Sequence, residues 1–276
     1  MVICDMVGEV RAVPLARAPA RLCVAQFGRG MCAGARAAFS HSRDRETDAR
    51  MHRTRRRPRP RGRITTANAL TFAALLGAAG LALLWFVVNP LTAVLTFASL
   101  IGYAVIYTGI LKRATSQNIV IGGLAGAAPP LLGWTAVTGQ VSLMPLLLLL
   151  IVFVWTPPHF WPLAIQRRDD YAEVNMPMLP VTHGDIYTRW QILFYTALLV
   201  AVTTLPFIFG LSGLLYLAGA LVLGGRFLWH AVNLLTADAR ARPVSVFHYS
   251  ITYSMLLFAA FLAYSYQTVV FGLSRL

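Results

Sequence analysis

The sequence predicts an all-α protein, a polytopic bundle of membrane-spanning helices, on three observations. Of the 276 residues, 57% are hydrophobic and only 12% are charged, and the mean hydropathy is +0.63. A soluble chain of this size has too little polar surface to cover such a core. Beyond residue 64 the chain is a series of apolar runs of roughly twenty residues each, the length that spans a bilayer. Finally, basic residues recur in every second connection between these runs.

Seven of these runs are predicted as helices, at 66–87, 91–110, 118–137, 143–164, 189–209, 212–234 and 246–270. Short turns are predicted at Asn89-Pro90, Thr138-Gly139-Gln140 and Gly210. Longer connections are expected at 111–117, 165–188 and 235–245. The pair Pro129-Pro130, with glycines nearby, is expected to make the third run easy to kink.

The distribution of positive charge predicts the orientation. Basic residues lie before the first run, after the second, after the fourth and after the sixth, at Arg50 to Arg63, Lys112-Arg113, Arg167-Arg168, and Arg240 with Arg242. The connections at 88–90, 138–142 and 210–211 carry no charge. Because Lys and Arg mark cytoplasmic loops, we expect a multi-pass protein of the bacterial inner membrane, with the N-terminus inside and the C-terminus outside. The net charge of +14 does not indicate nucleic-acid binding, since no RNA or DNA module is recognisable.

Asp169 and Asp170 are the strongest candidates for a functional site. The chain has only ten Asp and Glu residues, and this adjacent pair directly follows an apolar, aromatic-rich helix. Carboxylates near hydrocarbon are costly and usually functional. Beside Arg167 and Arg168, the pair suits a divalent metal and a phosphorylated substrate. The structural alternative is a charge-balanced flank that ends a membrane span.

Three further positions carry weaker signals. Asp44 and Asp48 would share one face of a helix and could hold Mg²⁺, or they belong to a solvated linker of mixed charge. Lys112 and Arg113 could clamp phosphate, or they are an ordinary cytoplasmic flank. His159 lies deep in an aromatic helix, where it contacts a porphyrin or is a packed, hydrogen-bonded histidine.

Several motifs follow one another along the chain: Tyr107-Thr108, Lys112 through Gly123, Ala125 through Pro130, Gly133-Trp134, Trp155-Thr156-Pro157-Pro158-His159-Phe160-Trp161, Asp169-Asp170-Tyr171 and Met176 through Val181. Together they resemble the protohaem IX farnesyltransferases (haem O synthases), a family of UbiA-type intramembrane prenyltransferases. The resemblance covers about residues 44 to 270.

The resemblance implies a helical bundle around a central cavity, with two Asp motifs at its cytoplasmic mouth. It implies Mg²⁺ as cofactor, with the metal ligands and catalytic residues Asp44, Asp48, Asp169 and Asp170. Ser40 departs from the asparagine that the family's first motif carries. Substrate-binding positions carried over or inferred are Lys112, Arg113, Asn118, Arg168, Tyr171, Trp155 and His159.

The reaction that the resemblance implies is transfer of a farnesyl group from farnesyl diphosphate to a vinyl group of haem B, giving haem O for haem A and cytochrome oxidase biogenesis. The expected partners are farnesyl diphosphate, haem B, the lipid bilayer and the downstream haem A synthase. Two alternatives stay open: a prenyltransferase with an aromatic acceptor, and an inactive relative or haem-binding membrane protein.

The N-terminal residues depart from the family pattern. The family has nine membrane helices, two of them before the first Asp motif, whereas we predict seven. Residues 1–39 are therefore expected to be an atypical segment, disordered or out of frame, with a mitochondrial presequence as the rival interpretation. Residues 40–63 are expected to form a basic cytoplasmic loop with the first Asp motif, and residues 64–276 the transmembrane bundle.

Overall fold

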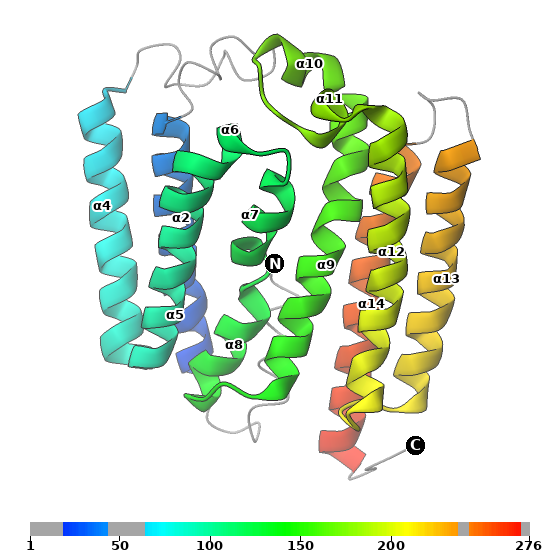
Figure 1. Ribbon diagram of the computed structural model, residues 1–276. Helices are drawn as coiled ribbons and strands as arrows, with labels where there is room; N and C mark the ends of the chain where they lie inside the picture. Colours follow the sequence, from blue (N-terminus) through cyan, green and yellow to red (C-terminus); the bar gives the residue numbers. More distant parts are fainter. Residues whose placement is uncertain (1–18, 44–63, 237–242, 272–276) are drawn as a thin grey trace.

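The computed structural model describes residues 19–43, 64–236 and 243–271, and all regular structure in these ranges is helical (Figure 1). Seven helices or helix pairs are long and apolar enough to cross a membrane, which confirms the predicted number. They are α4 (Thr66–Leu83) with η1 (Leu84–Val88), α5 (Pro90–Ile101) with η2 (Gly102–Leu111), α7 (Asn118–Gly126) with α8 (Pro129–Thr138), α9 (Leu143–Gln166), α12 (Gly184–Ile208), α13 (Leu214–Thr236) and α14 (Pro243–Phe271). The shorter helices are α6 (Lys112–Ala114), α10 (Arg168–Glu173) and α11 (Leu179–Thr182).

The predicted boundaries are close to those observed, with two differences of physical interest. The third span is broken between α7 and α8, where Pro129 and Pro130 cannot supply the amide hydrogens of a continuous helix, so the predicted kink is a full interruption. The fifth span begins at residue 184 rather than 189. Gly184 has φ +82°, a left-handed conformation that glycine adopts without strain, and this turns the chain directly into α12.

The expectation of an unstructured N-terminal segment is wrong for residues 19–39. These residues belong to α2 (Pro19–Arg43), a helix of 25 residues and thus as long as the membrane spans. At position 19 the chain therefore lies at the opposite end of the bundle from Arg43, although we predicted the N-terminus on the same side as residues 40–63. Residues 1–18 and 44–63 lie outside the described ranges. The sequence did not indicate α2, because four arginines and many small residues interrupt its apolar character.

Small residues let α2 and α4 approach closely in antiparallel directions. A β-carbon on Gly80 would lie 2.8 Å from the carbonyl oxygen of Gly28 and 2.9 Å from the sulfur of Cys32. Farther along, Gly34 faces Leu76, as an added β-carbon would lie 3.1 Å from that side chain. Without a hydrophobic driving force between helices in lipid, such close backbone contact supplies the dispersion energy for association.

A polar network joins the start of α5 to the end of α8. The Asn89 side-chain oxygen accepts a 2.8 Å hydrogen bond from the Thr92 amide and so caps α5. Its amide nitrogen donates to the carbonyl of Thr135 at 2.8 Å, and the Thr92 hydroxyl lies 3.1 Å from that of Thr135. The predicted turn at Asn89-Pro90 is therefore also a contact between two spans.

The main hydrophobic core lies between α9, α12, α13 and α14, where Trp161, Phe227 and Phe261 are almost fully buried. More than half of the α9 window is buried inside the protein, so α9 is the central helix of the bundle. Figure 1 shows α9 between the α12–α14 group and the helices α7 and α8.

The α2–α4 contact predicts the effect of adding one methyl group. Gly80→Ala places the new carbon against backbone, so the helices must separate, and we expect a loss of about 1–3 kcal/mol of stability. A lower midpoint of thermal unfolding in detergent would measure this loss. Gly225→Ala is the matched control, because its β-carbon would meet nothing within 4 Å. Equal midpoints for the two variants would contradict the described contact.

Candidate active site

Helix α9 carries the chain from the bundle core to the acidic pair. It contains Pro157, Pro158 and Pro162, all buried, yet continues to Gln166. Prolines are tolerated in membrane helices where neighbouring groups satisfy the freed carbonyls. Just before the first proline, the Thr156 hydroxyl donates to the Val152 carbonyl at 2.8 Å. Thr156 also packs on Gly123 of α7, where a β-carbon would lie 3.0 Å away. Helix α9 thus holds the acidic pair that follows it at a defined position relative to α7.

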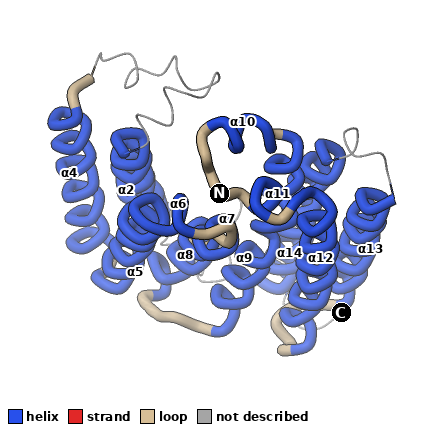
Figure 2. The backbone as a smooth tube through the Cα atoms, turned by 45° about the horizontal axis from the view of Figure 1, so that its top comes forward, coloured by secondary structure: helices blue, strands red, loops and turns tan. Residues whose placement is uncertain are grey.

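Asp169 and Asp170 lie in the first turn of α10, and both are exposed. No residue of α10 is buried, and Figure 2 shows this helix at the rim of the bundle. The chain returns to the bundle through Asn175, whose φ of +52° is a left-handed conformation that asparagine tolerates. Buried Met176 and Met178 then anchor the segment before α11. The acidic pair is therefore open to solvent on a segment fixed at both ends.

Arg168 forms an ion pair with Asp185 of α12, with 3.6 Å between the guanidinium Nη1 and the carboxylate oxygen. Asp185 is also in the first turn of its helix, where a negative charge is favoured by the helix dipole. The pair is partly exposed, so it orients α10 more than it stabilises the fold. Asp185 was missed in the sequence, although it is one of only five acids after residue 48.

Lys112 and Asn118 flank the turn between α6 and α7. Asn118 is fully buried and donates its side-chain amide to the Lys112 carbonyl at 3.3 Å, while its side-chain oxygen is buried without a hydrogen-bond partner. Asn118 therefore fixes the backbone of Lys112 rather than facing open space. The side chain of Arg113 lies outside the described part of the structure. Figure 1 places α6 and α10 at the same end of the bundle.

Trp155 and His159 join α9 to α14. The His159 ring is stacked between Trp155, with centroids 4.1 Å apart, and Phe247, at 4.7 Å. Its Nδ1 lies 2.7 Å from the hydroxyl of Ser250, and the Trp155 indole nitrogen donates to the Ser250 carbonyl at 2.9 Å. This is the packed, hydrogen-bonded alternative for His159.

The described residues can supply a metal ion with only part of a ligand set. They contain no group of three His, Cys, Asp or Glu side chains placed to share an ion, and Asp44 and Asp48 lie outside the described ranges. Two solvent-facing carboxylates fit Mg²⁺, which is commonly held by one or two carboxylates together with substrate phosphates. Tyr171, next to the pair, is half-buried.

The helical bundle, with charged residues of α6 and α10 at one end, defines a membrane protein of one known class. The family model described as the UbiA prenyltransferase family matches residues 3–260, and the chain belongs to that family. The matched range includes most of the residues before position 40, and it confirms the wider resemblance that the motifs indicated.

Curated relatives narrow the resemblance. The chain is 53% identical over 274 residues to the protoheme IX farnesyltransferase of Teredinibacter turnerae, covering 99% of this chain and 88% of that protein. It is 55% identical over 271 residues to the protoheme IX farnesyltransferase of Stutzerimonas stutzeri, covering 98% and 91%.

Solved structures share the fold. A digeranylgeranylglyceryl phosphate synthase superposes with a TM-score of 0.80 at 18% identity, covering 95% of this chain and 92% of that one. A UbiA homologue from Archaeoglobus fulgidus, bound to GPP and Mg²⁺, superposes with a TM-score of 0.71 at 13% identity, covering 97% and 94%.

The α9–α14 junction predicts a stability effect at Ser250. Ser250→Ala leaves a buried His159 nitrogen without its partner, so we expect a loss of about 1–3 kcal/mol, seen as a lower midpoint of thermal unfolding in detergent. Thr252→Val is the matched control, because that exposed hydroxyl contacts only its own helix. A midpoint equal to wild type in Ser250→Ala would show that the hydrogen bond contributes nothing.

Proposed function

We propose that this chain transfers a farnesyl group from farnesyl diphosphate to a vinyl group of haem B, giving haem O. The observation that supports it most is sequence identity above 50% to protoheme IX farnesyltransferases over nearly the whole chain. The exposed acidic pair of α10 lies at the same end of the apolar bundle as Lys112. These charged groups are of the kind that such a transfer needs.

The proposed reaction has to ionise an allylic diphosphate and keep water from the resulting cation. The carbon–oxygen bond of the prenyl diphosphate breaks, and the terminal vinyl carbon of haem B forms the new carbon–carbon bond. The cation left beside the porphyrin then takes up water and loses a proton. The balance is haem B, farnesyl diphosphate and water giving haem O and diphosphate.

Asp169 and Asp170 would hold Mg²⁺ together with the diphosphate oxygens, and Asp44 and Asp48 are proposed to complete the set. When bound, Mg²⁺ neutralises the charge that develops on the leaving diphosphate. The A. fulgidus homologue bound to GPP and Mg²⁺ supports this assignment through its shared fold.

Basic side chains near the acidic pair would bind the same diphosphate. Lys112 and Arg113 are proposed to donate hydrogen bonds to its oxygens. Arg168 is half-exposed, so it can reach a ligand while Asp185 fixes its direction. Tyr171 is proposed to contact the same group.

The apolar interior would receive the isoprenoid chain and exclude water from the allylic cation. Trp155 and His159 are held in the α9–α14 junction, so we propose that they shape the acceptor region rather than move on binding. The bundle lies in a membrane, and we propose the bacterial inner membrane with the acidic pair on the cytoplasmic face. A downstream haem A synthase is the proposed recipient of haem O.

Purified protein in lipid nanodiscs, supplied with haem B, farnesyl diphosphate and Mg²⁺, tests the proposal. We expect haem O by chromatography and mass spectrometry, and its loss when EDTA removes the metal. An aromatic acid in place of haem B tests the alternative acceptor. Consumption of farnesyl diphosphate with the aromatic acid but not with haem B would replace the proposed acceptor, and a Soret shift without product would indicate a haem-binding protein.

The acidic pair predicts a loss of activity without a loss of fold. Asp169→Asn and Asp170→Asn keep the size of each side chain but remove the charge, so we expect turnover to fall by about 100-fold or more in each. Both residues are exposed, so the midpoint of thermal unfolding should not change. Glu173→Gln, on the same exposed helix, is the control and should keep its activity. Wild-type turnover in either aspartate variant would remove that residue from the site.

A further inference from the structure

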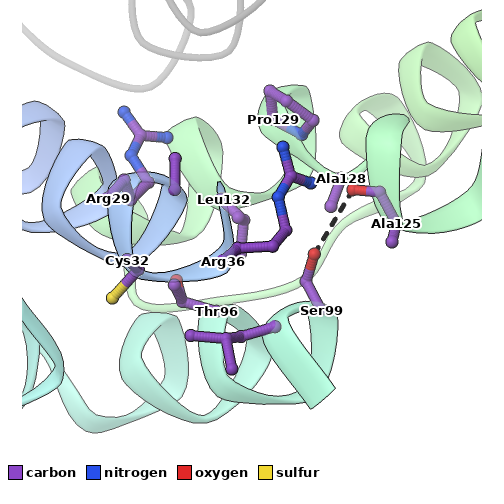
Figure 3. A pocket seen from close by; sticks show the side chains of 11 residues that line it. Arg29, Cys32, Arg36, Thr96, Ser99, Ala125, Ala128, Pro129 and Leu132 are labelled. Atoms are coloured by element: carbon purple, nitrogen blue, oxygen red, sulfur yellow. Dashed lines mark hydrogen bonds between the residues drawn. The ribbon is translucent and has the colours of Figure 1, made fainter. Parts of the chain in front are cut away.

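Arg226 differs from the arginines in the interior of the other long helices, because it faces out of the bundle. It is exposed on α13, which lies at the edge of the bundle beside α12 (Figure 1, Figure 2). By contrast, Arg29 and Arg36 of α2 line a pocket among the helices (Figure 3). Arg189 of α12 is buried and donates to the Leu234 carbonyl at 3.3 Å. Charged side chains of membrane helices almost always face a bundle interior, so an outward one indicates a partner from outside.

The outward face of α13 is otherwise apolar, as a face in contact with lipid should be. Its exposed side chains include Leu221, Val222, Trp229 and Val232. Arg226, His230 and Asn233 follow one another at i, i+4 and i+7, so they share one flank of the helix. This polar flank runs toward Thr236, where α13 ends at the end of the bundle that bears α10.

The polar flank lies against Tyr249 of α14. The guanidinium carbon of Arg226 lies 5.4 Å from the centre of the Tyr249 ring, and the His230 ring stacks on the same ring with centroids 4.7 Å apart. The Tyr249 hydroxyl donates to the Leu223 carbonyl at 2.9 Å, which fixes the ring in place. An aromatic face attracts a guanidinium but gives its N–H groups no oxygen to bind. Neither α13 nor α14 contains an acidic residue, and Arg226 has no ion pair within the described ranges.

Two exposed tryptophans mark the level at which hydrocarbon gives way to headgroups. With a rise of about 1.5 Å per residue, Trp190 lies about 9 Å from Gly184, where α12 begins, and Trp229 about 10 Å from Thr236. Both indoles are exposed, and tryptophans are enriched at the membrane–water interface. From Trp190 to Phe209, which caps the other end of α12, the helix rises about 28 Å, close to the hydrocarbon thickness of about 30 Å. The last two turns of α13 therefore lie among the headgroups.

Arg226 reaches this level through the length of its side chain. Its α-carbon lies about 5 Å deeper than that of Trp229, a distance that an arginine covers when it extends toward the interface. Tyr249, the ring that its guanidinium contacts, is about 9 Å from Pro243, where α14 begins at the same end of the bundle. The guanidinium therefore lies near the headgroup boundary beside His230, not at the depth of its own backbone.

We propose that Arg226 and His230 bind the phosphate of an anionic phospholipid on the lipid-facing side of α13. Phosphate oxygens match the guanidinium fork and accept charge-assisted hydrogen bonds. Anionic lipids attract basic side chains at a membrane surface, and basic sites on membrane helices bind their headgroups. Trp229 then lies beside the first carbons of the acyl chains. A free phosphate would have to enter the layer of lipid that borders this flank, so the lipid is the favoured source of the same chemical group.

Photo-crosslinking of the full chain in a neutral detergent tests the proposal. The probe is phosphatidylglycerol with a photoreactive group on an acyl carbon close to the headgroup, and mass spectrometry maps the cross-linked peptides. We expect cross-links on α13 around Trp229. Unlabelled phosphatidylglycerol should displace them at a concentration at least about tenfold lower than phosphatidylcholine with the same acyl chains, the effect of one charge-assisted hydrogen bond.

Variants of Arg226 assign the effect to its charge. Arg226→Gln should abolish the difference between the two lipids at α13. Arg226→Lys keeps the charge and should keep most of the difference, which loss of a merely structural contact would not allow. Arg167→Gln is the matched control, because it removes one positive charge at the same end of the bundle, where α9 meets α10, and it should behave as the wild type does.

Equal displacement by the two lipids in the wild type would overturn the proposal, and this comparison needs no variant to fold. An unchanged difference in Arg226→Gln would overturn it as well. Displacement by inorganic phosphate at the same concentration as phosphatidylglycerol would replace the lipid by a free anion. None of these readouts involves haem O, so the lipid site and the proposed function can fail separately.

Discussion

Everything in this bundle depends on satisfying backbone groups where helices are interrupted inside apolar surroundings, because hydrocarbon offers no water to pair with them. At the far end of α8, the left-handed Gly139 donates to the Thr135 carbonyl at 2.9 Å, and Asn89 donates to the same oxygen. At the α7–α8 break, the Ala127 amide donates to Gly123 at 2.8 Å, and Ser99 satisfies Ala125. These hydrogen bonds let the chain bend at the end of α8 and at the α7–α8 break.

The two halves of the bundle pack by different means, and the candidate site lies at one end of both. Around α9, large aromatic side chains fill the core, and the His159 stack fixes α14. Around α2 and α4, glycines bring backbones together. The half around α9 sets the position of α10 and its aspartates. The α2–α4 half brings Arg29 and Arg36 of α2 against α5.

The sequence was sufficient for the spans, because apolar length is a strong one-dimensional signal. The acidic pair stands out by its isolated carboxylates, and its role stays a prediction. The sequence was not sufficient for α2, whose arginines lower its hydropathy while glycines and alanines give it a packing face. Nor did it separate the two roles open to His159, since a stack with Phe247 and a bond to Ser250 join residues about 90 positions apart. The ion pair of Arg168 with Asp185 was hidden for a simpler reason: the two charges are 17 positions apart in a connection without periodicity.

The polarity of α2 has a consequence for how the protein is made. A translocon-inserted helix gains about 2.5–3.5 kcal/mol of unfavourable free energy for each arginine at its centre, and α2 carries two in its interior. Such a helix does not partition into lipid alone. It packs closely against α4, so we expect the two helices to enter the bilayer together as an antiparallel hairpin. The close contact at Gly80 would then serve membrane insertion as well as the finished fold.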